Sequence, residues 1–472
     1  MREGKFIVGM AVCAITLSAS AGAPGADQST DVSQELSQLR DTVSQMQERI
    51  DELEAGQGDN WMTEARADEV RGLVADVLSD ADTRSSLLQN GSLAGWNNGF
   101  YLGSADGNFH LKIGGQLQVR WVYNNRDMPP GSDLGGDENR HGFEMRRVRL
   151  LFSGHIVDPS WTYDIQINQN RSGGTFFLED FAYIQKDLGG GWRIRAGQMK
   201  APFLREEMLS SIRMLPVERT LVNSSFTAGT VQGVMVWWNN EDFRAYGMYH
   251  DGDGSANTAW SMEDTEYAFT ARGEWKAAGD WNQFNDWSGF PDEDFGVLVG
   301  AAVNYNEGEY GTGMNLPAPD FNNLEVENLG FTVDAMIDFS GASIGGALVY
   351  RNLKAGTGVG SVDLEQIGFF VRGGYFITED WEIYGQYEWA DLDIAGLEDL
   401  SVITVGVTKY WAKHNLKWQT DIGFGLNDVN AVANPLMPGS TVGFANDGAG
   451  WRTDTTGNDG QMVIRSQLQL VF

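Results

Sequence analysis

Hydrophobic and polar residues alternate along residues 109–123 and again along residues 460–472. Successive side chains of a β-strand point to opposite faces, so each segment has one apolar and one polar face. In the first segment the apolar face consists of Phe109, Leu111, Ile113, Leu117, Val119, Trp121 and Tyr123. A soluble β-sandwich also shows alternation, but its polar face meets bulk solvent and its strands are usually shorter. Repetition of the pattern along the chain favours a transmembrane β-barrel, whose outside is apolar and whose inside is polar.

Sixteen segments with strand-like patterns follow one another from about Gly99 to the C-terminus. They are residues 109–123, 143–157, 160–168, 176–186, 191–199, 230–238, 243–249, 266–276, 295–305, 328–338, 342–351, 365–375, 381–389, 401–411, 414–426 and 460–472. The sequence therefore predicts an all-β membrane protein, with a sixteen-stranded antiparallel transmembrane β-barrel over residues 98–472.

The connections between these segments are alternately long and short. The long ones are residues 124–142, 200–229, 250–265, 306–327, 352–364, 390–400 and 427–459. Two connections break the pattern, because residues 169–175 are short for a loop and residues 277–294 are long for a turn. Long loops at one end and short turns at the other are typical of bacterial outer-membrane barrels. An even strand number places both barrel ends on the short-turn, periplasmic side, so we expect the preceding residues to project into the periplasm.

Three segments are expected before the barrel. Residues 1–21 have the basic start, the apolar stretch and the Ala19-Ser20-Ala21 ending of a secretory signal peptide, with cleavage as late as Ala26 as the alternative. Residues 30–56 are predicted to form an α-helical coiled coil for oligomerisation, because apolar residues recur there with a 3.5-residue period. That seam consists of Leu36, Leu39, Val43, Met46, Ile50 and Leu53. A single amphipathic helix lying on another domain is the alternative. Residues 58–97 are expected to form a helical linker.

The composition and the scattered polar residues argue against several functions. A formal net charge of −32 argues against nucleic-acid binding, which needs clustered Lys and Arg. Residues 251–262 begin like a calcium loop, but Ala256 replaces the turn glycine and Met262 takes the place of the bidentate glutamate. The five histidines lack metal-ligand spacing, and Ser210-Ser211 suggests no nucleophile–base pair. The sequence therefore predicts no metal, no cofactor and no enzyme activity.

Two motifs resemble those of a known family, the phosphate-selective porins of the O and P type. The first motif is Phe143–Leu150, with the sequence FEMRRVRL, and the second is Ile194–Phe203, with the sequence IRAGQMKAPF. The second is followed by Glu206, Ser210-Ser211 and Glu218-Arg219, and the resemblance covers roughly residues 98–472. It implies a sixteen-stranded trimeric diffusion channel of the outer membrane. It also implies that the third long loop, here residues 200–229, folds into the lumen.

Inward positions carry charges of both signs. The predicted pore-lining cations are Lys112, Arg120, Arg147, Arg149, Arg193, Arg195, Arg272 and Arg372, and those of the constriction loop are Lys200, Arg205, Arg213 and Arg219. Stacked guanidinium groups favour anions, because they supply fixed positive charge and donors that match oxyanions. Inward acids include Asp164, Glu274, Asp334, Glu382, Glu388 and Asp421, and opposed rows of both signs give a transverse field with little preference. We expect passive diffusion of small hydrophilic solutes or ions. The pattern slightly favours a channel that prefers anions or phosphate over one without a preference.

Two alternatives and several partners complete the expectations. The chain is alternatively a structural outer-membrane anchor whose coiled coil contacts the cell wall, or an outer-membrane hydrolase. The terminal Phe472 resembles the recognition signal of the barrel-assembly machinery. The expected partners are two further copies of the chain in a homotrimer, outer-membrane lipids, the assembly machinery and, through the coiled coil, peptidoglycan.

Overall fold

The computed structural model describes residues 40–49, 92–96, 99–126, 138–171, 173–260, 265–309, 325–357, 360–435, 441–454 and 460–472. The chain divides into two compact units, Met1–Ser86 and Leu87–Phe472. In the first unit residues 40–49 are helical, with Val43 half-buried and Met46 61% exposed. The rest of the predicted coiled-coil seam, the signal segment and residues 58–91 lie outside the described residues. No helix in the described residues is long and apolar enough to span a membrane.

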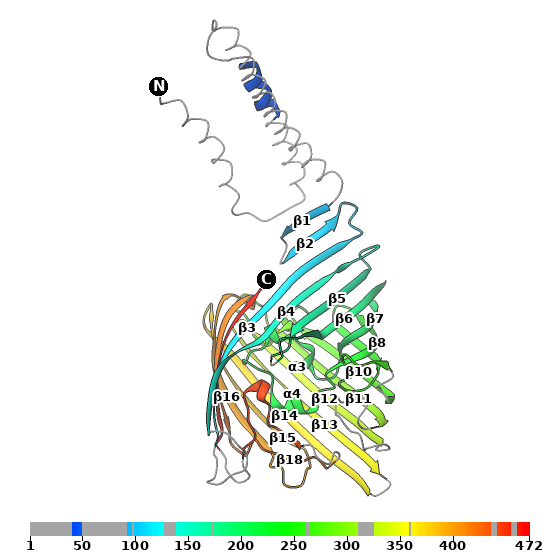
Figure 1. Ribbon diagram of the computed structural model, residues 1–472, viewed down its shortest axis with the longest axis vertical. Coiled ribbons are helices and arrows are strands. Elements are labelled where there is room, and N and C mark those ends of the chain that lie inside the picture. Colours follow the sequence, from blue (N-terminus) through cyan, green and yellow to red (C-terminus); the bar gives the residue numbers. More distant parts are fainter. Residues whose placement is uncertain are drawn as a thin grey trace. The chain divides into compact units, whose positions relative to one another are not determined.

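The second unit contains a closed antiparallel barrel of sixteen strands among the described residues (Figure 1). The strands are β3 (His110–Asn125), β4 (Asn139–His155), β5 (Trp161–Gln169), β6 (Phe176–Gly189), β7 (Trp192–Lys200), β8 (Thr230–Asn239), β9 (Phe243–His250), β10 (Thr265–Ala278), β11 (Gly296–Glu309), β12 (Glu325–Phe339), β13 (Ala342–Thr357), β14 (Gly360–Thr378), β15 (Trp381–Asp391), β16 (Leu400–Ala412), β17 (Leu416–Gly425) and β20 (Met462–Val471). Strand β20 pairs with β17 on one side and with β3 on the other, which closes the barrel. The predicted fold class and strand number are confirmed.

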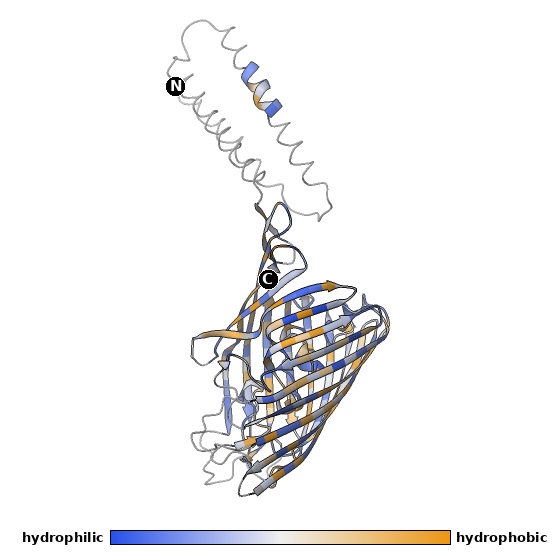
Figure 2. Cartoon of the chain, turned by 90° about the vertical axis from the view of Figure 1, so that its right-hand side faces the viewer, coloured by the Kyte–Doolittle hydropathy of each residue, from blue (hydrophilic) through white to orange (hydrophobic). Residues whose placement is uncertain are grey.

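Alternation of residue type along each strand produces an apolar outside and a polar inside, as the banded colours of Figure 2 show. In β12, Phe331 and Val333 are 47% and 54% exposed, whereas the neighbouring Thr332 and Asp334 are buried. Exposed aromatic side chains gather near the short-turn ends of the strands: Trp192, Phe243, Trp275, Phe339, Tyr375 and Trp411. An apolar band bordered by aromatic residues is the surface that a lipid bilayer requires.

Two expectations about the strands are wrong. The predicted helical linker extends to residue 97, but Ser92–Trp96 form strand β1, which pairs with β2 (Phe100–Ser104) and through it with the start of β3. Residues 352–364 are mostly paired strand and not a long loop, because β13 and β14 stay in register up to Thr357 and Gly360. Their inward residues there are apolar and buried, namely Leu353, Ala355 and Leu364, so the expected polar inward face is missing from the pattern.

The apolar core of the protein lies inside the barrel, because three connections fold inward. The constriction loop, residues 201–229 between β7 and β8, contains α3 (Arg205–Met208), η1 (Ser211–Arg213) and α4 (Leu221–Phe226). The inserted turn, residues 279–295 between β10 and β11, contains η3 (Gln283–Asn285), and the last loop, residues 426–461, contains β18 (Ala431–Ala433), β19 (Thr441–Gly443) and η4 (Asp447–Ala449). One cluster of buried side chains joins all three to the wall, among them Leu221, Phe226, Trp287, Phe444, Trp451, Val349 and Val402.

Candidate functional site

Glu218 fixes the constriction loop to the wall formed by β3 and β4. Its carboxylate accepts hydrogen bonds from Arg120 at 2.9 Å, Arg146 at 2.5 Å and Arg147 at 3.1 Å. Although burial by itself raises the pKa of Glu218, the guanidinium groups of Arg146, Arg147 and Arg120 lower this pKa well below its usual range. Three guanidinium groups around this carboxylate hold it ionised at neutral pH.

A β-bulge in the FEMRRVRL motif allows two successive arginines to reach Glu218. Gln118 pairs with Arg147 and Val119 pairs with Met145, so Arg146 is an extra residue in β4. In a regular strand adjacent side chains point to opposite faces, whereas a bulge can turn both to the same side. Arg146 was missing from the predicted pore-lining set because strict alternation assigns it to the lipid face. The sequence signal for the bulge is the pair of consecutive arginines within an otherwise amphipathic strand.

Further contacts attach the constriction loop to another part of the wall, formed by β14 and β15. Glu206 accepts a hydrogen bond from Arg372 on β14. The backbone N–H groups at the start of α4 donate to Glu388 on β15, from Leu221 at 2.6 Å and Val222 at 3.2 Å. The loop therefore spans the lumen between walls on both sides, as expected for a loop that folds inward.

Most of the predicted pore-lining cations are paired with carboxylates. Arg120 contacts Glu144 and Glu218, Arg149 lies 3.7 Å from Asp180, and Arg193 lies 3.0 Å from Asp187. Arg272 contacts Asp334 at 2.8 Å and Glu274 at 2.9 Å. Such pairs cancel much of the charge that a passing ion would meet.

Two predicted pore-lining cations differ from the rest. Lys112 lies where β3 pairs with β2 and not with β20, beyond the section in which β20 closes the barrel. Arg195 on β7 faces the lumen and makes no contact with a carboxylate among the described residues.

The predicted cations of the constriction loop mainly hold the loop itself. Lys200 contacts Asp180 at 3.1 Å and Glu207 at 3.4 Å, and Arg219 also contacts Glu207. Arg205 is buried, donates to the carbonyl of Phe284 in the inserted turn and lies 3.7 Å from Glu274. Arg213 on η1 is half-buried and has no carboxylate partner within the described residues.

The inserted turn fills the short-turn half of the lumen beside β12–β17. Phe290 packs on Phe376, Tyr410 and His414, and Trp287 is 1% exposed beneath the guanidinium groups of Arg205 and Arg372. Asp286 contacts His414 at 3.1 Å, and burial lowers the pKa of His414. Inward acids of this wall are covered: Asp338 and Glu382 accept hydrogen bonds from the inserted turn, and Asp421 accepts one from Val217 of the constriction loop. Each of the three is at 0% exposure.

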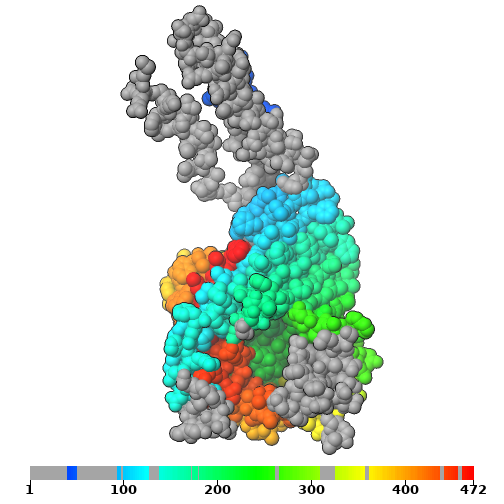
Figure 3. Space-filling view, in the orientation of Figure 1, coloured from blue at the N-terminus to red at the C-terminus, as the bar shows by residue number. Residues whose placement is uncertain are grey.

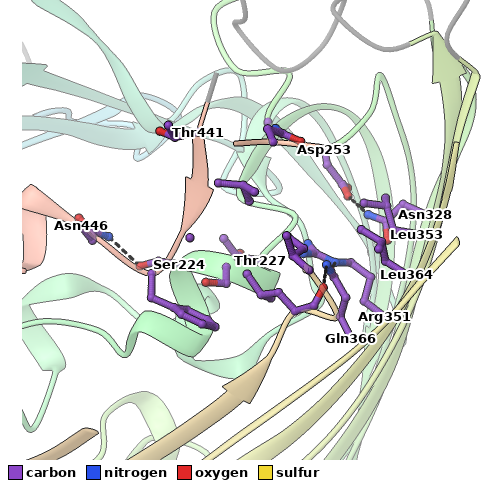
Figure 4. Close-up of a pocket in the computed structure, with 18 of the residues that line it drawn as sticks. Ser224, Thr227, Asp253, Asn328, Arg351, Leu353, Leu364, Gln366, Thr441 and Asn446 are labelled. Carbon is purple, nitrogen blue, oxygen red and sulfur yellow. Dashed lines mark hydrogen bonds between the residues drawn. The ribbon is translucent and has the colours of Figure 1, made fainter. Parts of the chain in front are cut away.

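On the long-loop side of the constriction loop lies a cavity of about 690 Å³, the loop-side cavity (Figure 4). Arg351 of β13 points into it, with Nε donating to Gln366 at 2.7 Å and the guanidinium 4.9 Å from the ring of Phe226. No carboxylate contacts Arg351 among the described residues. Asp253 also lines this cavity, but it accepts hydrogen bonds from Asn304 and Asn328. In the space-filling view a recess opens here between the green and the orange-red surfaces (Figure 3).

On the other side of the constriction loop, beside β6–β9, lies a cavity of about 280 Å³, the turn-side cavity. It is lined by Phe181, Tyr183, Arg195, Lys200, Pro202, Met208, Met235, Trp237 and Tyr246. The inward side chains of this wall are partly exposed, unlike those covered by the inserted turn. Each of these two cavities contains an arginine without a carboxylate contact in the described chain. Arg351 could not be singled out from the sequence, because its strand has an apolar inward face.

Residues 112–286, which include the two motifs and the constriction loop, match the family model of phosphate-selective porin O and P. Over these residues the chain is similar to this porin family. A closed barrel with an apolar outside and a polar lumen, crossed by an inward-folded loop, agrees with that assignment. The family match and the fold support an outer-membrane channel, and neither the anchor nor the hydrolase alternative is favoured by these findings.

Solved structures of similar fold are also porins and channels. The anion-selective porin from Comamonas acidovorans is 14% identical over 77% of this chain and 99% of its own, with a TM-score of 0.52. The channel DcaP of Acinetobacter baumannii is 12% identical over 80% of this chain and 100% of its own, with a TM-score of 0.49. OmpF of Salmonella typhi is 13% identical over the same shares, with a TM-score of 0.46. No curated protein sequence matches the chain significantly.

Proposed function

We propose that this porin conducts small hydrophilic solutes by passive diffusion and prefers anions to cations. The observation that carries the proposal is the pair of arginines, Arg351 and Arg195, one in each lumen cavity and neither in contact with a carboxylate. A guanidinium in a water-filled cavity attracts anions and offers N–H donors to oxyanions. The acids that would oppose this effect, such as Glu382, are covered by inserted segments.

The preference is expected for anions in general and does not require phosphate. Each cavity offers one guanidinium without a carboxylate contact, and Arg351 shares its cavity with Asp253. A phosphate dianion would need more positive charge than one arginine supplies. Monovalent anions therefore fit both cavities better.

Reversal potentials in a KCl gradient test the proposal. Wild-type channels in a planar bilayer should show a potential of the sign expected for chloride permeation. Arg195→Gln and Arg351→Gln should each reduce that potential, and the double variant should bring it near zero. Lys409→Gln is the matched control, because it also removes one positive charge. Lys409 lies on the outward face, where it pairs with Asp380 beside Trp381. A cation-selective wild type, or variants that behave like the control, would overturn the proposal.

Channel activity also separates this proposal from a structural anchor or an enzyme. An anchor would show no conductance steps, and a hydrolase would release product from an ester or lipid substrate. The hydroxyl of Ser211 accepts hydrogen bonds from Gln116 at 3.3 Å and Arg149 at 2.9 Å, and it donates to no base among the described residues. Its contacts are those of a loop anchor.

We propose that Phe472 acts as the assembly signal of the barrel. The residue exchanges backbone hydrogen bonds with Gly115 at 2.8 and 3.0 Å, and its ring covers Gly115 so closely that a Cβ there would lie 2.3 Å from it. Removing Phe472 should lower the amount of barrel in the outer membrane without lowering export, measured by fractionation. Equal outer-membrane amounts of the truncated protein would contradict this role.

A further inference from the structure

The turn-side cavity has a wall of aromatic rings from neighbouring strands. Trp237 of β8 and Tyr246 of β9 stack with their ring centres 5.9 Å apart and their planes 16° apart. Tyr183 of β6 meets Phe181 edge-on, with ring centres 5.9 Å apart. Aromatic side chains usually fill a core, but these four are only partly buried and line open space.

Small and apolar residues complete the cavity. Gly197 and Gly233 lie in one cross-strand row beside Tyr183, and a Cβ at either would lie 2.2–2.3 Å from a neighbouring backbone oxygen. This row therefore cannot carry side chains that would fill the space. Pro202 and Met208 of the constriction loop contribute the opposite, apolar side.

The positive charge of Arg195 remains accessible in the turn-side cavity. The Nε and Nη2 groups of Arg195 donate to Gln185 at 3.1 and 2.8 Å, and the guanidinium lies 3.9 Å from the ring centre of Tyr183. Lys200, the other cation, is neutralised by Asp180 and Glu207. The nearby Asp164 accepts the hydroxyl of Tyr183 at 2.5 Å and does not contact Arg195. A further guanidinium, that of Arg193, lies 4.5 Å from the ring centre of Trp237 but pairs with Asp187. The cavity thus offers a single guanidinium without a carboxylate contact beside several aromatic rings.

We infer that the turn-side cavity is a binding site for aromatic monocarboxylates that pass through the channel. The inference rests on the proposed anion preference and names the class of anion. A carboxylate matches the donor geometry of one guanidinium, and an aromatic ring can pack edge-to-face against the rings of Trp237 and Tyr246 that line the cavity. A volume of about 280 Å³ is near the lower end of the range of small-molecule sites and suits a single ring. An inorganic anion would leave the aromatic wall without contacts.

Block of the KCl current by benzoate tests the inference. Wild-type channels in a planar bilayer receive benzoate, cyclohexanecarboxylate or inorganic phosphate on the short-turn side. Benzoate should reduce the current at a concentration several-fold lower than cyclohexanecarboxylate, which has the same charge without an aromatic ring. Each aromatic contact is expected to change affinity roughly two- to twelvefold. Phosphate should give the weakest block.

Variants assign the block to this cavity. Trp237→Leu should raise the half-blocking concentration of benzoate five- to tenfold and hardly change that of cyclohexanecarboxylate. Trp237→Phe, which keeps a ring, should restore most of the effect and also guards against misfolding of the leucine variant. Arg195→Gln should weaken the block by both carboxylates, whereas Lys409→Gln should leave both unchanged.

Different results would overturn the aromatic site and the anion preference. Equal block by benzoate and cyclohexanecarboxylate, or benzoate block unchanged in Trp237→Leu, would overturn the aromatic site even if reversal potentials showed anion preference. A cation-selective reversal potential would overturn the anion preference itself, whatever benzoate does.

Discussion

At the scale of single residues, the partner of each charged group decides its role more than its type does. Arg120 and Arg195 both face the lumen, but Arg120 contacts Glu144 and Glu218 whereas Arg195 contacts no carboxylate among the described residues. A carboxylate at contact distance cancels most of the field of a guanidinium, so counting inward arginines overstates the attraction of anions. Only unpaired arginines beside a cavity are expected to select solutes.

The stability of the inserted turn should depend on pH through Glu293. Burial and the carboxylate of Asp286 raise the pKa of Glu293 to about 7 from 4.5, although the N–H of Phe290 and the charge of Lys413 act in the opposite direction. The folded state therefore holds the proton more tightly than the unfolded chain. The turn is most stable below pH 4.5, loses stability as the pH rises towards about 7, and changes little through this group above that pH.

Hydrogen exchange of residues 284–294 at pH 5.5 and pH 8, corrected for the intrinsic rate, measures this effect. Wild type should exchange faster at pH 8 than at pH 5.5, and Glu293→Gln should remove most of the difference. Glu365→Gln is the control, because Glu365 is exposed near the start of β14, whereas the inserted turn packs on Phe376 near the end of this strand. The same pH difference in Glu293→Gln as in wild type would show that another group, such as His414, is responsible.

At the scale of elements, the bulge in β4 places the second arginine against Glu218. Deleting Arg146 should leave a regular strand, because the pairs Gln118–Arg147 and Val119–Met145 then follow directly. The barrel should fold, and the constriction loop should lose a charged hydrogen bond worth about 1–3 kcal/mol. Faster proteolysis of the loop, in a barrel with unchanged heat modifiability, is the expected result.

Arg146→Gln is the matched control for the deletion, because it removes the charge but keeps the extra residue. Both variants should expose the loop to protease to a similar extent. Misfolding of the deletion alone would show that the bulge itself sets the register of β3 and β4.

The constriction loop should limit conductance. Helix α4 contributes Leu221 and Phe226 to the core and lies beside the loop-side cavity. Replacing residues 221–226 with a short Gly-Ser linker should widen the passage and raise single-channel conductance, while Glu218 still holds the other part of the loop. Unchanged conductance in a folded variant would mean that the narrowest point lies elsewhere, for example at the inserted turn.

At the scale of the whole molecule, the lumen is asymmetric. The inserted turn and the constriction loop cover the inward face of β12–β17, whereas the inward face of β5–β9 stays partly exposed. Solutes that leave the constriction loop are therefore expected to follow the wall with Arg195 and Trp237. This route is where the aromatic site is proposed.

We expect a homotrimer in which the barrel, and not the N-terminal coil, drives assembly. Val43 is only half-buried and Met46 is exposed in the single chain, so a predicted coiled-coil seam has an apolar face to cover. Three helices tethered to a trimer would pair at high local concentration, which offsets the short length of the coil. Replacing Val43 and Ile50 with Asp should abolish helix pairing but leave a conducting trimer, detected on unheated gels and in bilayers. Monomers in that variant would show that the coil is required.

Strand alternation and spacing suffice to predict the barrel, its sixteen strands and its ends. Because the barrel has lipid outside and water inside, apolar and polar residues alternate along every strand. This alternation can be recognised in each strand from its own sequence. Residues 352–364 were not recognised as strand because their inward side is apolar. Leu353 and Leu364 face the apolar segments inside the lumen, so the pattern does not resemble that of a membrane strand.

The alternation along the strands assigned Arg120, Arg147, Arg149, Arg272 and Arg372 to buried inward positions, but it did not single out Arg146 or Arg351. Only the tertiary structure decided which of them are neutralised, because the partners lie far apart in the chain. Glu218 meets Arg120 from 98 residues away, and Arg372 meets Glu206 from 166 residues away. The inward folding of residues 279–295 and the two cavities depend on packing among several strands at once. Alternation reports the environment of each side chain, lipid or lumen, whereas selectivity depends on the distances between side chains that the closed barrel brings together.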